Sequence, residues 1–340
     1  MNRLIYLGYS RALKILNRNI STYNFDEITS DWEVALEKSV VNSIFMTPLW
    51  QKIWCNQFVE KSNLKILRLP LNADLGIAPL MIKNGTISLI GSTDLFDYRD
   101  FVVPRGLEKE FYIAILDQID LFDWKSIKLS SIREDSPTLN TFASIAKNNM
   151  GYDIQILEED VSPGMNLPND WEEFISNLPK KDRHELRRKI RRLERYGEVG
   201  FQVLTNSADV KINISDFFSL MKKSRLDKAE FLTDERESFF RTISTELSNI
   251  NQLRLYFLEL NGIRVAATLG FEYNNNFYLY NSGYDPEYSS LSVGLISKAY
   301  CIKDAIENEM TYFDFLRGSE SYKYHLGGKD KLLYEMIINR

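Results

Sequence analysis

The chain has 340 residues, enough for two domains of ordinary size, and 44% of them are hydrophobic, which excludes a disordered protein. Its formal net charge of −5 argues against a protein that coats nucleic acid, so no DNA partner is expected. Two cysteines and two histidines exclude a disulfide framework and a multi-histidine metal site, and they favour a reducing cytoplasm.

Residues 1–24 are predicted to be an N-terminal extension. Basic side chains at Arg11, Lys14 and Arg18 interrupt its apolar residues, which is not typical of a signal peptide. An extra helix packed on the fold is favoured over a segment in weak contact with a membrane surface. No run of about 18 apolar residues occurs, so no transmembrane helix is expected.

Residues 25–160 are predicted to form a first mixed α/β domain. Three strands joined by Asn-containing turns are predicted in LKILRLPLNADLGIAPLMIKNGTISLIGS, followed by a helix and a further strand. The loop STDLFDYRDFVV places charges around an aromatic ring, which suits sugar or peptide recognition and equally suits a solvated turn. We therefore consider Tyr98 and Arg99 as contacts for an acceptor substrate.

The segment 158–170, rich in Pro, Gly and Asp, is predicted to link this domain to a second one over residues 165–340. The second domain repeats the three-strand order in LRLYFLELNGIRVAATLGFEYNNNFYLYNSG. A helix beginning after Ser292, which is predicted to cap it, follows these strands. The segments YFDFLRG and KLLYEMIIN are predicted to be the last two strands of this domain.

The stretch LPKKDRHELRRKIRRLERYG, residues 178–197, carries nine Lys or Arg in an otherwise acidic chain. Asp182 and Glu185 have the spacing of a capping box that opens a helix. The apolar stripe of that helix, Leu186, Ile190 and Leu193, directs one group of arginines into water: Arg188, Arg191, Arg192 and Arg195.

Arg183 and Arg187 flank this stripe, as Lys189 does. We predict that Arg183 and Arg187 hold a phosphate of an acceptor or donor substrate, because the guanidinium fork binds phosphate oxygens in pairs. Two alternatives stay open. Binding of tRNA would engage the outer arginines as well, and a merely solvated face would engage none of them.

The order of elements, with the segments LPKKDRHELRRKIRRLE, GIRVAATLGFEYNNNFYLYNSGYDPEYSSLSVG and YFDFLRGSESYKYHLGG, resembles the GNAT acyltransferase superfamily, in its CelD/BcsL-like branch related to the Fem aminoacyltransferases. The resemblance covers roughly residues 25–340. It implies an α/β (α+β) fold of two tandem GNAT-like domains, each a mixed, mostly antiparallel sheet flanked by helices. It also implies transfer of acyl or aminoacyl groups to cell-envelope polysaccharide or peptidoglycan precursors.

The same resemblance implies a donor site at the start of the helix after GYDPEYSSLS. Acyl-CoA would be a co-substrate there, not a permanently bound cofactor. A helix N-terminus and a glycine suit close approach of a phosphate, although SLSVGL holds a single glycine where such loops usually hold more. The donor residues implied are Ser290, Ser292, Val293, Gly294 and Leu295. Tyr284 and Asp285, just before them, are expected to contact substrate.

Asp314 alternates with Phe313 and Phe315 in a predicted strand. A carboxylate in such surroundings needs a partner or a function, and a raised pKa would suit a general base. The alternative is an ion pair with Arg317 or Lys323. Tyr322 and Lys323 are assigned to assist catalysis by protonating the leaving thiolate or holding an anionic acceptor, with ring packing as the alternative for Tyr322.

These features together predict a cytoplasmic acyltransferase. It would move an acyl group from acyl-CoA to an amine or hydroxyl of a cell-envelope glycan or polysaccharide precursor, a small molecule that bears a phosphate or a glycan. Aminoacyl-tRNA as donor is one alternative. A non-catalytic binding protein on the same fold is another.

Overall fold

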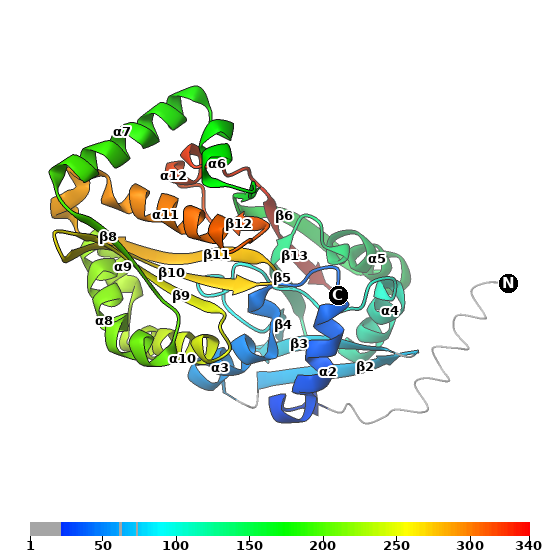
Figure 1. Cartoon of the computed structure of the whole chain (residues 1–340). Helices are drawn as coiled ribbons and strands as arrows, with labels where there is room; N and C mark the ends of the chain where they lie inside the picture. The colour runs from blue at the N-terminus through cyan, green and yellow to red at the C-terminus, as the bar shows by residue number, and fades with distance from the viewer. Residues whose placement is uncertain (1–21, 61–62, 73) are drawn as a thin grey trace. The chain divides into compact units, whose positions relative to one another are not determined.

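The computed structural model describes residues 22–60, 63–72 and 74–340. The chain divides into two compact units: the first ends at Glu159 and also contains Leu332–Arg340, and the second is Asp160–Lys331. Each contains one mixed sheet flanked by helices, which confirms the predicted fold class (Figure 1). Nearly all of the predicted extension, residues 1–21, lies outside the described residues.

The first unit contains a seven-stranded sheet and four α-helices among its described residues. The strands, in spatial order, are β1 (Thr22–Tyr23), β2 (Leu64–Leu71), β3 (Asp74–Lys83), β4 (Thr86–Leu89), β5 (Ser126–Arg133), β13 (Leu332–Asn339) and β6 (Asp153–Val161). The helices are α2 (Phe25–Glu37), α3 (Pro48–Phe58), α4 (Glu108–Ile119) and α5 (Ala143–Met150).

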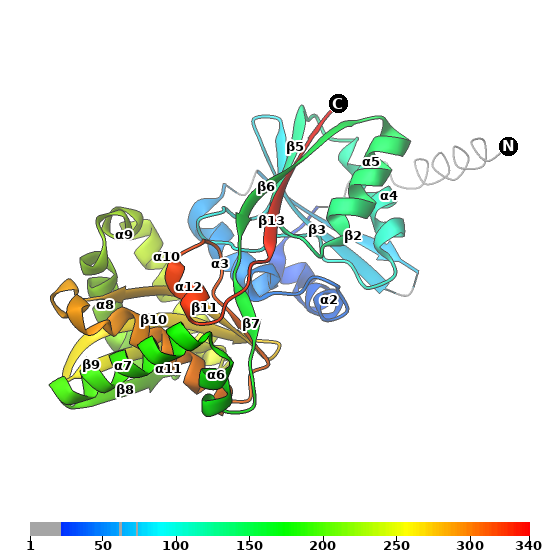
Figure 2. The same cartoon turned by 90° about the horizontal axis from the view of Figure 1, so that it is seen from above.

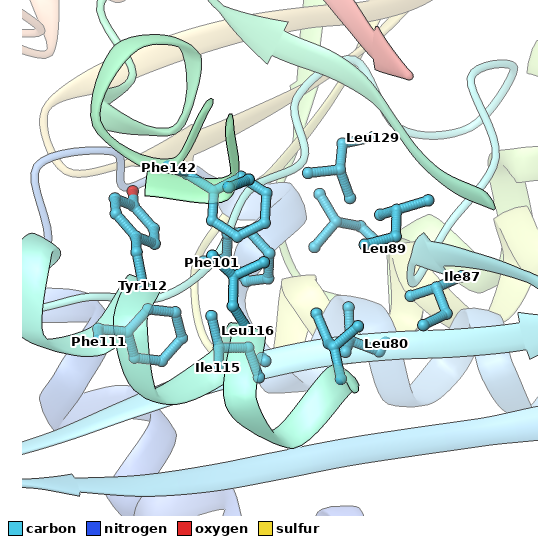
Figure 3. Packing of buried hydrophobic residues seen from close by; sticks show 14 of the residues in the cluster. Leu80, Ile87, Leu89, Phe101, Phe111, Tyr112, Ile115, Leu116, Leu129 and Phe142 are labelled. Carbon is cyan, nitrogen blue, oxygen red and sulfur yellow. The ribbon is translucent and has the colours of Figure 1, made fainter. Parts of the chain in front are cut away.

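The core of this unit forms where α4 packs on the sheet. Figure 3 shows Phe111, Ile115 and Leu116 from α4 gathered with Leu80 and Leu89 from the strands. The three α4 side chains, Phe111, Ile115 and Leu116, fall at positions i, i+4 and i+5 of the helix, so one face of α4 is buried.

The last strand of the chain, β13, was predicted to belong to the second domain, but it pairs antiparallel with β5 in the sheet of the first unit. Leu333, Met336 and Ile338 are fully buried there. The period-2 alternation of KLLYEMIIN predicts a strand correctly. It does not specify the partner strand, because a half-buried strand fits any sheet that offers a free edge and an apolar face.

The second unit contains a six-stranded sheet with helices on both faces. Its strands, in spatial order, are β7 (Gly164–Asn166), β12 (Tyr312–Asp314), β11 (Asn276–Tyr284), β10 (Ile263–Tyr273), β9 (Leu253–Leu260) and β8 (Val199–Leu204). Its helices are α6 (Trp171–Asn177), α7 (Lys180–Tyr196), α8 (Ser207–Ser224), α9 (Leu226–Phe231), α10 (Asp234–Asn249), α11 (Val293–Glu307) and α12 (Ser321–His325).

Helix α11 covers one face of this sheet, and α8 with α10 covers the other, while α7 contacts α11 on its outer side (Figures 1 and 2). Gly283 lets α8 approach β11 closely, because a Cβ atom at this position would lie 2.3 Å from the backbone nitrogen of Met221. Among the described helices, none is long and apolar enough to span a membrane.

Candidate active site

The sheet of the second unit opens between two parallel strands. β11 pairs with β12 only through Asn276, Phe277 and Tyr278, because β12 ends at Asp314. Within the described residues, no strand pairs with the rest of β11 on that edge. An open strand edge offers backbone N–H and C=O groups to a ligand that contains amides or a carbonyl.

A cavity of about 220 Å³ lies where α11 begins, directly after β11. It is lined by Tyr284, Ser289, Ser292, Val293, Gly294, Leu295, Lys298 and Tyr322. Six of these residues were predicted as site residues from the sequence. Ser290 was also predicted, but it is exposed and does not line the cavity, whereas its neighbour Ser289 does.

The start of α11 differs from the serine cap that the sequence predicts. Ser292 adopts a left-handed backbone conformation, with φ at 60°, and its side chain does not cap the helix. The first hydrogen bonds of the helix run from the amides of Leu295 and Ile296 to the Ser292 carbonyl. The amides of Val293 and Gly294 therefore precede the intrahelical ladder, at the positive end of the helix dipole.

Arg192 of α7 reaches this helix start, contrary to the expectation that it points into water. It is half-buried, and its Nη2 donates to the Ser292 Oγ at 3.2 Å. Among the described residues, its Nε is shielded from solvent and has no hydrogen-bond partner. Arg192 lies about 120° from the apolar stripe, so its long side chain can return to the protein body along the helix surface.

Lys298, like Ser289, is a cavity residue that sequence reasoning missed. It lies one turn after Gly294, is 8% exposed, and its Nζ donates to the Gly294 carbonyl at 3.0 Å. Its ammonium group lies 4.7 Å from the centre of the Tyr322 ring. Burial, followed by the charge of Lys228, lowers the pKa of Lys298 to about 7. The available signal was a lysine in the apolar helix segment VGLISKAYCI.

A second lysine, Lys228 of α9, lies at the open edge of β11. Its Nζ donates to the Ser282 carbonyl and to the Asn281 Oδ1. Burial and the neighbouring charge of Arg225 lower the pKa of Lys228 to about 8. The Ser282 amide donates to the Asn281 side chain, so both backbone groups of Ser282 have local partners that a ligand can replace.

The predicted catalytic residues Asp314 and Lys323 do not line the cavity. The Lys323 Nζ donates to the carbonyls of Leu316, Arg317 and Gly318 at 2.8, 2.6 and 2.9 Å, and it pairs with Glu320 at 2.9 Å. An ammonium held by four oxygens has little capacity left for a substrate. Lys323 therefore organises the loop after β12.

Asp314 takes part in the same loop. Its Oδ1 accepts from the Leu316 amide at 2.8 Å and from the Ser162 Oγ at 3.3 Å. The Leu316 backbone has φ at 61°, so the carboxylate supports a conformation that is unusual for leucine. Tyr322, in contrast, does line the cavity, and burial raises the pKa of its phenol well above its usual value.

Arg183 and Arg187 both contact α6 and do not line the cavity. The Arg183 Nη1 donates to the Ser176 carbonyl at 2.8 Å, and Arg187 pairs with Glu172 at 2.9 Å. The predicted capping box is wrong, because α7 begins at Lys180 without a side-chain cap.

Asp182, the predicted cap residue, pairs with the Nδ1 of His325 at 2.8 Å. Three of the arginines that were predicted to be solvated, Arg188, Arg191 and Arg195, are exposed.

The remaining predicted substrate contacts, Tyr98, Arg99 and Asp285, interact with other parts of the protein and do not line the cavity. Tyr98 and Arg99 are 3% and 6% exposed in the core of the first unit, where the Tyr98 ring packs on Phe45 and the Arg99 Nη1 donates to the Gly91 carbonyl at 2.9 Å. They are structural members of that core in this conformation. Asp285 accepts from the Glu287 amide and pairs with Lys223 at 3.1 Å.

A larger cavity, about 620 Å³, lies between α7, α11 and β8. Its walls combine the aromatic rings of Trp171, Phe201 and Tyr300 with carboxylates, among them Asp304, which accepts from Tyr256 at 2.8 Å. It contains no predicted site residue and does not reach the residues of the open strand edge. The smaller cavity is therefore the candidate active site.

Residues 180–324 match the family model described as an acetyltransferase (GNAT) domain. The solved structure of FemX is 12% identical, with a TM-score of 0.65, and the match covers 93% of this chain and 96% of that one. The C-terminal domain of a putative lysylphosphatidylglycerol synthetase from Agrobacterium fabrum is 9% identical, with a TM-score of 0.61 and 92% coverage of both chains. L-PGS from Bacillus licheniformis is 10% identical, with a TM-score of 0.56, covering 92% of this chain and 91% of that one. No curated protein matches the chain.

Proposed function

We propose that this chain, which has the Fem-related fold of the GNAT superfamily, is a cytoplasmic acyltransferase that moves an acyl group from acyl-CoA to an amine or hydroxyl of a cell-envelope glycan or polysaccharide precursor. One observation carries the proposal. The cavity at the start of α11 lies beside the end of β11 and contains the first-turn residues Val293 and Gly294. The half-buried Arg192 donates to the cavity residue Ser292, and all of these residues lie within the segment that matches the GNAT domain.

The anionic part of the donor is assigned to the start of α11. The amides of Val293 and Gly294 lie at the positive end of the helix dipole, and Arg192 adds a guanidinium group with an unpartnered, shielded Nε. Two positive groups side by side are unfavourable without an anion between them. A phosphate-bearing donor satisfies both, which is the reason for placing the phosphates of acyl-CoA here.

The acyl carbonyl is assigned to the open edge of β11. The acceptor amine or hydroxyl attacks the thioester carbon, so a C–N or C–O bond forms and the C–S bond breaks. Backbone N–H groups at the edge stabilise the oxyanion that develops between these two events. We assign the phenol of Tyr322, which lines the cavity and is protonated at neutral pH, as the group that gives a proton to the leaving thiolate. Burial raises its pKa, which makes it a weak acid in this role.

The acceptor class rests on the family resemblance, and the phosphate expected on the acceptor is assigned to Arg187. This residue is exposed and pairs with Glu172, which is also exposed. An ion pair between exposed groups contributes little, so a ligand phosphate can replace the carboxylate. Arg183 is a weaker candidate, since it already donates to the Ser176 carbonyl.

Aminoacyl-tRNA is the second candidate donor, and the exposed basic face of α7 favours it. Arg188, Arg191 and Arg195 are all exposed on this helix, which also brings Arg192 to the Ser292 hydroxyl at the start of α11. Many phosphate contacts would give binding a steep salt dependence, with a log–log slope of roughly 0.7 to 0.9 for each contact.

Calorimetry with coenzyme A and with tRNA tests these donors. We expect the wild-type protein to bind coenzyme A with a Kd below about 1 mM, with similar affinity at about 50 and 200 mM salt. A variant carrying Arg188→Ala and Arg191→Ala is expected to bind it equally well. If tRNA binds instead, with a steep salt slope and a loss in this variant, the second candidate replaces the first. If neither coenzyme A nor tRNA binds, the proposal that this chain is a transferase is wrong.

A further inference from the structure

Three lysines approach the candidate active site, and Lys298 differs from the other two in its partners. The Lys323 ammonium is held by four oxygens, and Lys228 donates to two oxygens at the strand edge. Lys298 has one hydrogen bond, to the Gly294 carbonyl, and the face of the Tyr322 ring. Glu320, whose charge acts on Lys298, pairs with Lys323 at 2.9 Å.

We propose that Lys298 is the general base of the acyl transfer and takes the proton from the acceptor amine or hydroxyl. The assignment rests on the proposed function, and it replaces Asp314 in the role of base. Lys298 lines the cavity beside the start of α11, whereas the Asp314 carboxylate holds the Leu316 amide and the Ser162 hydroxyl and lies outside the cavity lining.

The charged groups around Lys298 favour its neutral form. Burial has the largest effect on its pKa; Lys228 from α9 and Lys323 from α12 lower it further, and Glu320 and Cys301 oppose this. Two more cavity residues face this region, Tyr284 of β11 and Tyr322 of α12. At about pH 7, a lysine with this pKa is neutral in roughly half of the molecules, which suits a base working at cellular pH.

The geometry also orients the amine. One hydrogen of the neutral Lys298 points to the Gly294 carbonyl, and the Tyr322 ring covers one side. In the transfer, the acceptor N or O bonds to the acyl carbon, its proton moves to the Lys298 Nζ, and the thiol or ribose oxygen leaves with the electrons of the broken bond. The leaving group takes a proton from Tyr322, and the proton on Lys298 then passes to solvent and Tyr322 is reprotonated.

The protonation of Lys298 can be measured without any substrate. Trace labelling with acetic anhydride between about pH 6 and pH 10, quantified for each lysine by mass spectrometry, follows the neutral amine. We expect the Lys298 labelling to reach half its maximum near pH 7, and that of a free lysine peptide labelled in the same tube to do so above about pH 9. A midpoint for Lys298 above about pH 9 overturns the proposal, whatever coenzyme A binding shows.

The rate test uses acetyl-CoA as donor and glucosamine as a probe acceptor, with release of free thiol as the signal. Lys298→Met is expected to lower the rate by about 10² to 10⁴ without lowering the thermal stability, since it removes a buried amine. Lys298→Arg keeps a positive charge but cannot act as a base, so it is expected to be equally inactive. Recovery of activity in Lys298→Arg would assign a purely electrostatic role and overturn the proposal.

A chemical rescue gives the sharpest readout. Lys298→Cys alkylated with 2-bromoethylamine carries a thialysine, which is less basic than lysine. We expect activity to return in the alkylated variant, with the acidic limb of the pH profile at lower pH than in the wild type, because thialysine is less basic. In Asp314→Asn we expect the acidic limb to stay at the pH of the wild type. Wild-type protein treated with the same reagent is the control, because Cys55 and Cys301 are buried with raised thiol pKa values.

The outcomes separate the two claims. Three results contradict the role of Lys298 as the base. The acidic limb of the pH profile stays at the same pH after the chemical rescue, or it disappears in Asp314→Asn. The third is that acetyl-CoA acetylates Lys298 itself. Absence of coenzyme A binding contradicts the proposed donor, and the labelling midpoint of Lys298 then still decides whether the cavity holds a neutral lysine.

Discussion

The Arg192 Nη2 donates to the Ser292 Oγ at 3.2 Å, which joins the basic helix α7 to the first turn of α11. The two residues are 100 positions apart in the chain. This contact brings one arginine of the basic stretch to a helix N-terminus, where its charge has no carboxylate partner among the described residues.

Arg192→Ala should weaken coenzyme A binding by about tenfold or more, because a charge-assisted hydrogen bond to a phosphate contributes about 1.5 to 3 kcal/mol. Arg188→Ala is the matched control on the same helix. Its side chain is exposed and pairs with Glu185 at 2.6 Å, so affinity should stay within about twofold. Calorimetry measures both. Equal losses in the two variants would assign the effect to the overall charge of the helix.

Two glycines of the second unit should respond differently to alanine. Gly283→Ala places its Cβ 2.3 Å from the Met221 backbone nitrogen, so either α8 or β11 must move, at a cost of about 3 kcal/mol. Gly294→Ala meets only the Tyr284 ring, at 3.0 Å. Its unfolding free energy should change by less than about 1 kcal/mol, while coenzyme A affinity falls by about tenfold.

Urea unfolding and calorimetry separate these effects. If Gly294→Ala binds coenzyme A as the wild type does, the start of α11 is not the donor site. If Gly283→Ala is as stable as the wild type, the close approach of α8 to β11 is not required for the fold.

Lys323→Met should destabilise the second unit by about 3 kcal/mol, because three carbonyls that accept from its Nζ lose their partner in a buried site. Lys329→Met is the control, since that side chain belongs to an exposed residue. Thermal unfolding gives the comparison. A stable Lys323→Met variant without transfer activity would return Lys323 to the catalytic role that the sequence suggested.

Asp100 should make the stability of the first unit depend on pH. Burial raises its pKa from 3.8 to about 6, although Ser136 and Thr138 donate to the carboxylate. Because the folded state binds this proton more tightly than the unfolded state, the contribution is favourable below about pH 4 and is lost as the pH rises through about 6, at a cost of up to ~3 kcal/mol.

Asp100→Asn removes this titration and keeps the shape of the side chain. At about pH 7.5 the variant should be more stable than the wild type, and the difference should shrink toward about pH 4. Chemical unfolding followed at several pH values measures it. A difference that does not change over this range would show that Asp100 stays ionised in the folded protein.

The sequence by itself determined the local elements and the class of fold. Hydrophobic period and turn chemistry were sufficient to predict these elements, because each depends on interactions between residues close in the chain. They include the three-strand segments with Asn-containing turns, the amphipathic α7 and the helix after Ser292. The same locality explains why Tyr284, Ser292, Val293, Gly294 and Leu295 were found. They lie within one short segment, residues 284–295, and line one cavity.

Only the tertiary structure decided which side chains meet. β13 lies in the first sheet because alternation specifies a strand without specifying its partner. Lys298 and Tyr322 share a cavity because α12 packs near α11, and the Lys323 ammonium is held by the loop after β12. A pKa near 7 for Lys298 follows from burial and from lysines distant in the chain. Desolvation and charge proximity depend on distances in space, which a single sequence does not contain.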